Sequence, residues 1–197
     1  LDFDEDIEYF YKELGKIGAL GNTVIIISSD HGMHFITHRR IPLIMLFPNS
    51  ENAMQVEKDT QNLDIAPTIL DYLELNIPDW MVGKSLLQPL TEYRPIFGVR
   101  LKHNVEDEGG VFVLDNEFNT PPFYQFDIIG IENCGNWIEL SLEDYTWSSS
   151  SIEAYESNCN PTDILDRDEI HRFIIERLKQ DGFEFDETLI SLPPIKD

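Results

Sequence analysis

A short apolar segment that runs directly into polar residues places the tightest constraint on this fold. Val24 to Ile27 are four consecutive β-branched residues, and Ser28-Ser-Asp-His-Gly32 follows at once. An unbroken apolar run of this kind predicts a strand buried on both faces, as in a parallel sheet. Open α/β sheets bind their ligands at the C-terminal ends of such strands. The sequence therefore predicts an α/β fold with a ligand site at this corner.

Asp30 and His31 are the candidate metal ligands. Adjacent carboxylate and imidazole donors at a strand end suit a divalent cation. Gly32 allows the backbone to turn directly after them. The alternative is an ordinary turn in which the aspartate caps a helix, and the triplet alone does not separate the two.

The loop after this corner is basic in an otherwise acidic chain. His34, His38, Arg39 and Arg40 lie within ten residues of Asp30, although the whole chain has 14 Lys and Arg against 37 Asp and Glu. Imidazole can ligate a metal or act as a general acid, and arginine binds sulfate or phosphate oxygens in a bidentate manner. His38, Arg39 and Arg40 are therefore the candidate catalytic residues. A solvated loop is the alternative.

The net charge limits the classes of partner. A formal charge of −23 argues against binding to nucleic acid or to an anionic membrane surface. An anionic substrate would need a local cation, such as a bound metal with a few arginines. No apolar run is long enough to span a membrane. Because the chain begins at Leu1 and already reads as the inside of a domain, we expect a C-terminal piece of a longer protein.

Helix and strand patterns alternate over the first part of the chain. Apolar spacing predicts helices over 2–18 and 62–75, and a second apolar strand over 41–47. Either Asn62 or Asp64 is expected to cap the second helix. The residues expected on its buried stripe are Leu63, Ala66, Ile69, Leu70 and Leu73.

The pattern changes after residue 92. Short strand-like runs over 94–101, 110–114, 124–131 and 137–142 predict a small antiparallel sheet. A loop over 146–162 and a helix over 163–180 are expected to follow. We therefore expect two domains, 1–92 and 93–197. Cys134 and Cys159 are either one disulfide of an oxidising compartment or two unrelated thiols.

Four segments in this order carry a family resemblance. They are Gly18-Ala-Leu-Gly-Asn-Thr-Val-Ile-Ile-Ile-Ser-Ser-Asp-His-Gly32, Arg40-Ile-Pro-Leu-Ile44, Asp64-Ile-Ala-Pro-Thr-Ile-Leu70 and Gly83-Lys-Ser-Leu-Leu87. Together they resemble the C-terminal half of a sulfatase of the alkaline phosphatase superfamily, over about residues 2–100. The resemblance implies the C-terminal part of an α/β/α sandwich, followed by a small antiparallel sheet with a closing helix.

The resemblance also implies roles for individual residues. Asp30 and His31 would hold an active-site calcium, manganese or zinc ion. His38, or the neighbouring Arg39 and Arg40, would contact the substrate oxygens or the leaving group. The family nucleophile is a formylglycine-forming Cys or Ser, or a Thr, located before this corner. Neither cysteine of this chain lies in the Cys-x-Pro-x-Arg setting of that nucleophile.

Three functions follow from the resemblance as alternatives. The first is hydrolysis of an anionic sulfate or phosphate ester by the intact protein, with this fragment inactive alone. The second is a phosphoethanolamine or glycerophosphate transferase of the same superfamily. The third is a non-catalytic binding module with the sulfatase fold. A secreted or lumenal location is the family-level expectation, and the sequence does not address the oligomeric state.

Overall fold

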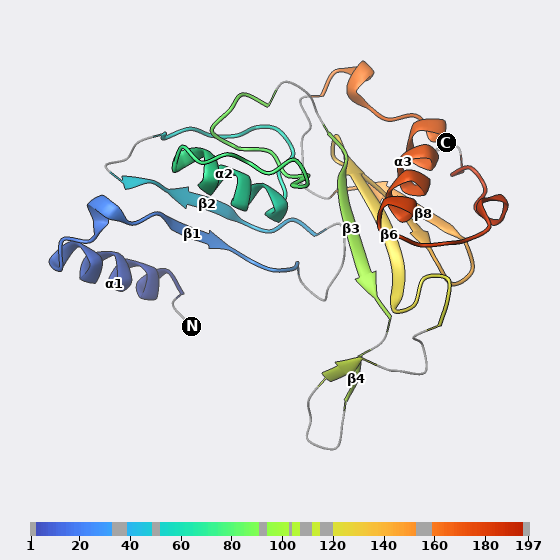
Figure 1. Cartoon of the computed structure of the whole chain (residues 1–197), viewed down its shortest axis with the longest axis horizontal. Coiled ribbons are helices and arrows are strands. Elements are labelled where there is room, and N and C mark those ends of the chain that lie inside the picture. Colours follow the sequence, from blue (N-terminus) through green and yellow to red (C-terminus); the bar gives the residue numbers. More distant parts are fainter. Residues whose placement is uncertain are drawn as a thin grey trace. The chain divides into compact units, whose positions relative to one another are not determined.

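A computed structural model describes residues 3–32, 39–48, 52–90, 94–102, 104–106, 112–114, 120–152 and 159–194. The chain forms two compact units. The first contains residues 1–30, 41–57 and 62–89, and the second contains 31–40, 58–61 and 90–197. Figure 1 shows their helices and strands. Within the described residues, no helix combines the length and the apolarity needed to cross a bilayer.

Among its described residues, the first unit contains two α-helices, two short 3₁₀ helices and one pair of strands. Helix α1 carries three acidic residues in its first turn and Lys16 in its last, an arrangement that complements the helix dipole. In chain order the elements are α1 (Phe3–Lys16), η1 (Leu20–Asn22), β1 (Ile25–Ser28), β2 (Leu43–Leu46), η4 (Asn62–Asp64) and α2 (Ile65–Tyr72).

Strands β1 and β2 pair antiparallel. The prediction that β1 lies in a parallel sheet is therefore wrong for its pairing with β2. Ile25 lies opposite Leu46, and Ser28 lies opposite Leu43. A parallel return needs a crossover connection, which is usually a helix. The described part of the segment between the strands contains no helix. An apolar run alone identifies the strand but does not distinguish the direction of its neighbour.

Segment 83–86 packs against η4 and α2 through polar contacts. The Asp64 carboxylate accepts the backbone N–H of Lys84 at 2.8 Å, and the Thr68 hydroxyl accepts that of Leu86 at 2.9 Å. A methyl group on Gly83 would lie 1.9 Å from the carbonyl oxygen of Leu63. Only glycine therefore allows the two segments to approach this closely.

These contacts correct two expectations about α2. Asp64 is the N-cap residue, but its side chain makes no capping hydrogen bond to the helix. The buried residues of α2 are Pro67 and Thr68, whereas the expected apolar stripe is at most partly buried. Leu63 and Leu73 are more than half exposed, and Ile69 and Leu70 are partly buried. The reason is that segment 83–86 covers the polar side of the helix.

The first unit leaves many of its large apolar side chains exposed. Helix α1 has no buried residue, and Phe10 is 52% exposed and Ile17 75% exposed. Leu86 is the only large aliphatic or aromatic side chain that is buried among the described residues of this unit. The periodicity predicts the helix correctly, but the described residues of the unit do not cover its apolar face.

The second unit is built on a four-stranded antiparallel sheet in the order β3-β6-β7-β8. Helix α3 lies against one face of this sheet (Figure 1). These elements confirm the small antiparallel sheet with a closing helix. Their bounds are β3 (Ile96–Leu101), β4 (Asn104–Glu106), β5 (Phe112–Leu114), β6 (Phe126–Asn133), β7 (Asn136–Ser141), β8 (Trp147–Ser151), η6 (Pro161–Asp163), α3 (Arg167–Gln180) and η7 (Glu187–Leu189).

Strand β8 falls where the sequence predicts a loop. It contains four consecutive serines, which lack the apolar alternation that identifies a strand. The neighbouring strand supplies the missing order, because Trp147 pairs with Leu140 and Ser151 with Asn136. Hydrogen bonding along β7 therefore decides the conformation of this polar segment.

The apolar core of the second unit lies between the sheet and α3. Ile129 and Leu140 of the sheet and Ile174 of the helix are each no more than 1% exposed. The helix begins at Arg167, four residues after the expected start, because Asp166 and Glu169 form a reciprocal capping box. The Asp166 side chain accepts the Glu169 N–H at 2.8 Å, and Glu169 accepts the Asp166 N–H at 3.0 Å.

A disulfide joins Cys134 to Cys159, which settles the alternative that the sequence leaves open. Cys134 lies in the tight turn between β6 and β7, and both Cys134 and Gly135 have positive φ values of 53° and 74°. Asn133, next to this turn, accepts the backbone N–H of Leu165 at 2.9 Å. The bond therefore links the β6–β7 turn to the chain that leads into α3.

Candidate active-site corner

The end of β1 is held by a side chain that the sequence does not single out for this purpose. Asn62 donates from Nδ2 to the carbonyl oxygen of Ser29 at 2.8 Å, and its Oδ1 accepts the hydroxyl of Ser28 at 3.1 Å. Asn62 thereby fixes the residues that directly precede Asp30. Its expected role as a helix cap is replaced by this contact with a strand distant in sequence.

His31 and Gly32 follow Asp30 in the chain and lie in the second unit. Nδ1 of His31 lies 2.9 Å from the carbonyl oxygen of Gly32. Because a carbonyl oxygen only accepts hydrogen bonds, Nδ1 carries the proton in this contact. The lone pair is then on Nε2, which is the form in which a backbone-oriented histidine ligates a metal.

Gly32 also brings Arg39 beside the corner. A methyl group on Gly32 would lie 2.3 Å from Cβ of Arg39 and 2.9 Å from its carbonyl oxygen. The backbone at Gly32 and Arg39 therefore approaches more closely than any other residue at position 32 would allow. Arg39 and Arg40 are both exposed. His38 and His34 lie outside the described residues.

The donor chemistry at the corner fits part of a metal site. Asp30 and His31 are both exposed and offer a carboxylate oxygen and an imidazole nitrogen, which are ligands of divalent cations. Among the residues that the structure describes, no three His, Cys, Asp or Glu side chains gather closely enough to hold a metal ion. The role of Asp30 and His31 as metal ligands therefore stays a prediction.

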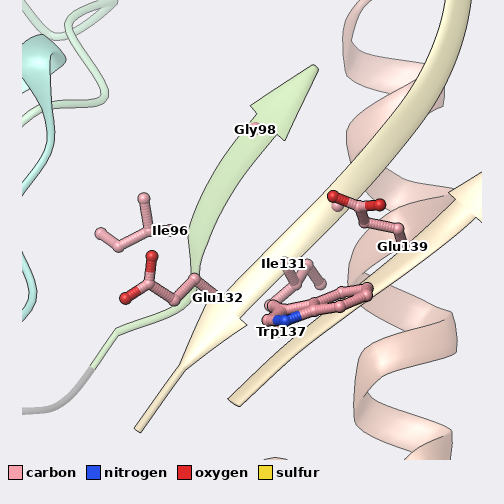
Figure 2. Close-up of a pocket in the computed structure, with 7 residues that line it drawn as sticks. Ile96, Gly98, Ile131, Glu132, Trp137 and Glu139 are labelled. Atoms are coloured by element: carbon pink, nitrogen blue, oxygen red, sulfur yellow. The ribbon is translucent and has the colours of Figure 1, made fainter. Parts of the chain in front are cut away.

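A second group of charged residues, missed in the sequence, lies on the sheet of the second unit. Glu132 of β6 and Glu139 of β7 line a pocket together with Gly98, Gly130 and Trp137 (Figure 2). Burial, and to a smaller extent the nearby Asp59, raise the pKa of Glu132 to about 7, and Arg40 opposes both effects. The sequence indicates this pocket only weakly. A glutamate after the apolar Ile129 and Ile131 is ordinary in a strand whose side chains point to opposite faces in turn.

The segment that carries this corner matches a known family. Residues 30–97 match the family model described as N-sulphoglucosamine sulphohydrolase, C-terminal. The match begins at Asp30 and extends through β2, α2 and the glycine at position 83 into β3. Residues 30–97, the sulfatase segment, are thus similar to the C-terminal portion of a sulfatase. The contacts of Asn62, Asp64 and Gly83 lie within this segment.

Individual sulfatases show the same relationship. The extracellular sulfatase SULF-1 homolog of Drosophila melanogaster is 33% identical over 97 residues, covering 43% of this chain and 9% of the relative. The N-acetylglucosamine-6-O-sulfatase of Bacteroides thetaiotaomicron is 33% identical over 105 residues, covering 47% and 19%. Arylsulfatase K of Bos taurus is 31% identical over 91 residues, covering 40% and 17%. The chain thus spans less than a fifth of the length of these relatives.

Proposed function

We propose that the full-length polypeptide containing this chain is a metal-dependent hydrolase of sulfate esters, and that this chain contributes one side of its active site. The observation that carries the proposal is the Asp30-His31-Gly32 corner inside the sulfatase segment, with Arg39 packed against Gly32. Asp30 and His31 supply a carboxylate and an imidazole suited to metal ligation, and Arg39 supplies a guanidinium suited to anion binding.

Each residue of the corner has a distinct proposed role. Asp30 and His31 hold a divalent cation, which when bound lowers the pKa of the nucleophile and offsets the charge of the ester oxygens. The contact of Nδ1 with the Gly32 carbonyl orients the His31 ring, and Asn62 fixes the strand end that presents Asp30. Arg39 binds the oxygens of the sulfate group. His38 is proposed to protonate the leaving group.

The nucleophile and the remaining metal ligands are proposed to come from a part of the polypeptide outside this chain. The uncovered apolar face of α1 and the exposed Leu63 and Leu73 support this, because apolar surface of that extent is normally buried. The chain alone is therefore expected to be inactive. The Cys134–Cys159 disulfide and the name of the extracellular relative favour a secreted or lumenal location.

The proposal is tested by assaying the full-length protein with calcium, manganese or zinc against p-nitrophenyl sulfate, a phosphate monoester and a phosphodiester. The Asp30→Ala variant is expected to lose nearly all metal-dependent turnover of the sulfate ester. Asp79→Ala is the matched control, because it removes an exposed carboxylate of the same unit that is not at the corner. Metal binding is measured separately by titration calorimetry.

Each result of this assay has a defined meaning. Turnover that persists in Asp30→Ala would refute the assignment of Asp30 as a ligand. A preference for a phosphate ester would favour the phosphotransferase branch of the superfamily. A folded wild-type protein that binds no metal and turns over none of the three esters would favour a non-catalytic binding module.

A further inference from the structure

Segment 83–86 holds the start of α2 through two buried acceptors. The Asp64 carboxylate accepts the backbone N–H of Lys84. The Thr68 hydroxyl accepts the backbone N–H of Leu86 and donates to the carbonyl oxygen of Asp64 at 2.6 Å. Asp64 and Thr68 are both 0% exposed, and buried polar groups are costly to leave without these partners. The position of Asp64 is therefore fixed by the segment that packs over it.

Gly83 touches the same stretch of chain at its backbone. A methyl group on Gly83 would lie 1.9 Å from the carbonyl oxygen of Leu63 and 3.1 Å from the backbone nitrogen of Asp64. These two atoms belong to the peptide unit that joins the last two residues of η4. Segment 83–86 therefore holds η4 at its backbone as well as at the side chain of Asp64.

The first residue of η4 holds the end of β1. Asn62 donates from Nδ2 to the carbonyl oxygen of Ser29, and its Oδ1 accepts the hydroxyl of Ser28. Because both ends of the amide are used, these contacts set its orientation. The carbonyl of Ser29 belongs to the planar peptide unit that contains the backbone N–H of Asp30. Asn62 therefore sets the peptide plane from which Asp30 continues.

Three consecutive residues thus connect segment 83–86 to the strand end. Asn62 contacts β1, the Leu63 backbone contacts Gly83, and the Asp64 side chain contacts Lys84. All of these residues, and Asp30 itself, belong to the first unit. Because η4 is a single turn that runs directly into α2, a displacement at Asp64 also moves Asn62.

We propose that segment 83–86 is a positioning element for the metal ligand Asp30 and that it acts through η4. Asn62 orients the strand end, and Asp64 and Thr68 keep Asn62 in place. The proposal rests on the proposed function for the ligand role of Asp30, whereas the order of the strand end does not depend on that role. Asp64 and Thr68 are fully buried, so their effect on a metal passes through their neighbours.

The experiment compares Asn62→Ala and Thr68→Val in the full-length protein. Asn62→Ala removes the contact with Ser29, and Thr68→Val removes the acceptor of the Leu86 N–H. Both variants are expected to weaken metal binding by about 10- to 100-fold, the usual effect of losing a residue that orients a metal ligand. Titration calorimetry measures this for whichever of calcium, manganese or zinc the wild type binds most tightly. Both variants should also speed amide exchange at Asp30 in the metal-free protein.

Ser85→Ala is the matched control in the same segment. The Ser85 hydroxyl donates to Asp71 in the last turn of α2 and accepts the backbone N–H of Leu87, so its contacts lie away from η4. This variant should lower the Tm but leave the metal affinity and the exchange at Asp30 as in the wild type. Gly83→Ala is a second disrupting variant and should behave like Thr68→Val, because the added methyl group displaces the segment.

The outcomes separate this proposal from the proposed function. Wild-type metal affinity and wild-type exchange at Asp30 in both Thr68→Val and Gly83→Ala would overturn the role of segment 83–86. Equally weakened metal binding in Ser85→Ala would also overturn it, because the effect would then follow stability alone. A wild type that binds none of the three ions would refute the ligand role of Asp30, and the exchange rates would still decide whether segment 83–86 orders the strand end.

Discussion

Reduction of the disulfide should destabilise the second unit by an amount set by the closed loop. Cys134 and Cys159 are separated by 25 residues in the sequence. In the chain-entropy model, a loop of this size lowers the free energy of unfolding by about 3.5 kcal/mol when it is opened. For a unit of this size the expected fall in Tm is about 10 °C. The effect arises in the unfolded chain, so the native packing around the turn should be preserved.

The assay is urea unfolding of the protein with and without dithiothreitol, followed by tryptophan fluorescence, since Trp137 and Trp147 both belong to the second unit. With a slope of about 2 kcal/mol/M, the midpoint should fall by about 1.5–2 M. A double Cys134→Ala, Cys159→Ala variant is the control and should not respond to the reductant. Equal midpoints for the oxidised and reduced wild type would refute the reasoning.

Three further perturbations probe other contacts. Gly83→Ala should lower the free energy of unfolding of the first unit by about 2 kcal/mol or more, because the added methyl group meets the Leu63 carbonyl. Gly21→Ala should have little effect, because nothing lies within 4 Å of the added methyl group, and thermal melts of the two variants test this. The pKa of Glu132 lies above its ordinary value, so the free energy of unfolding of the wild type should fall as the pH rises from about 4.5 to about 7. The expected fall is about 1–3 kcal/mol after allowance for solvent screening. A Glu132→Gln variant with the same pH dependence of stability would contradict the raised pKa of Glu132. Asn62→Ala should cost about 1–2 kcal/mol through the two lost hydrogen bonds at the end of β1, and faster amide exchange at residues 28–30 would show it.

Local patterns predicted those features that depend on local chemistry. The spacing of apolar residues was sufficient for α1, and the run of β-branched residues was sufficient for β1. Asp30 and His31 were identified because a carboxylate and an imidazole directly follow the apolar strand, and Gly32 because it allows the chain to turn after them. Their metal-binding role stays a prediction. The closing helix was also predicted, with its start displaced to the capping box at Asp166.

Contacts between distant segments were not predictable, since no periodicity encodes them. Three features each depend on a neighbour elsewhere in the chain: the antiparallel direction of β2, the strand formed by the serines of β8, and the burial of Thr68 rather than Leu73. The disulfide needed the two cysteines to be within bonding distance in space.

The sequence by itself determined the α/β class, the sulfatase-like corner and the acidic charge, because composition and short motifs carry this information directly. Only the tertiary structure decided that Asn62 holds the end of β1 and that Cys134 pairs with Cys159. These contacts join residues far apart in the sequence, and no periodic pattern of residues encodes them.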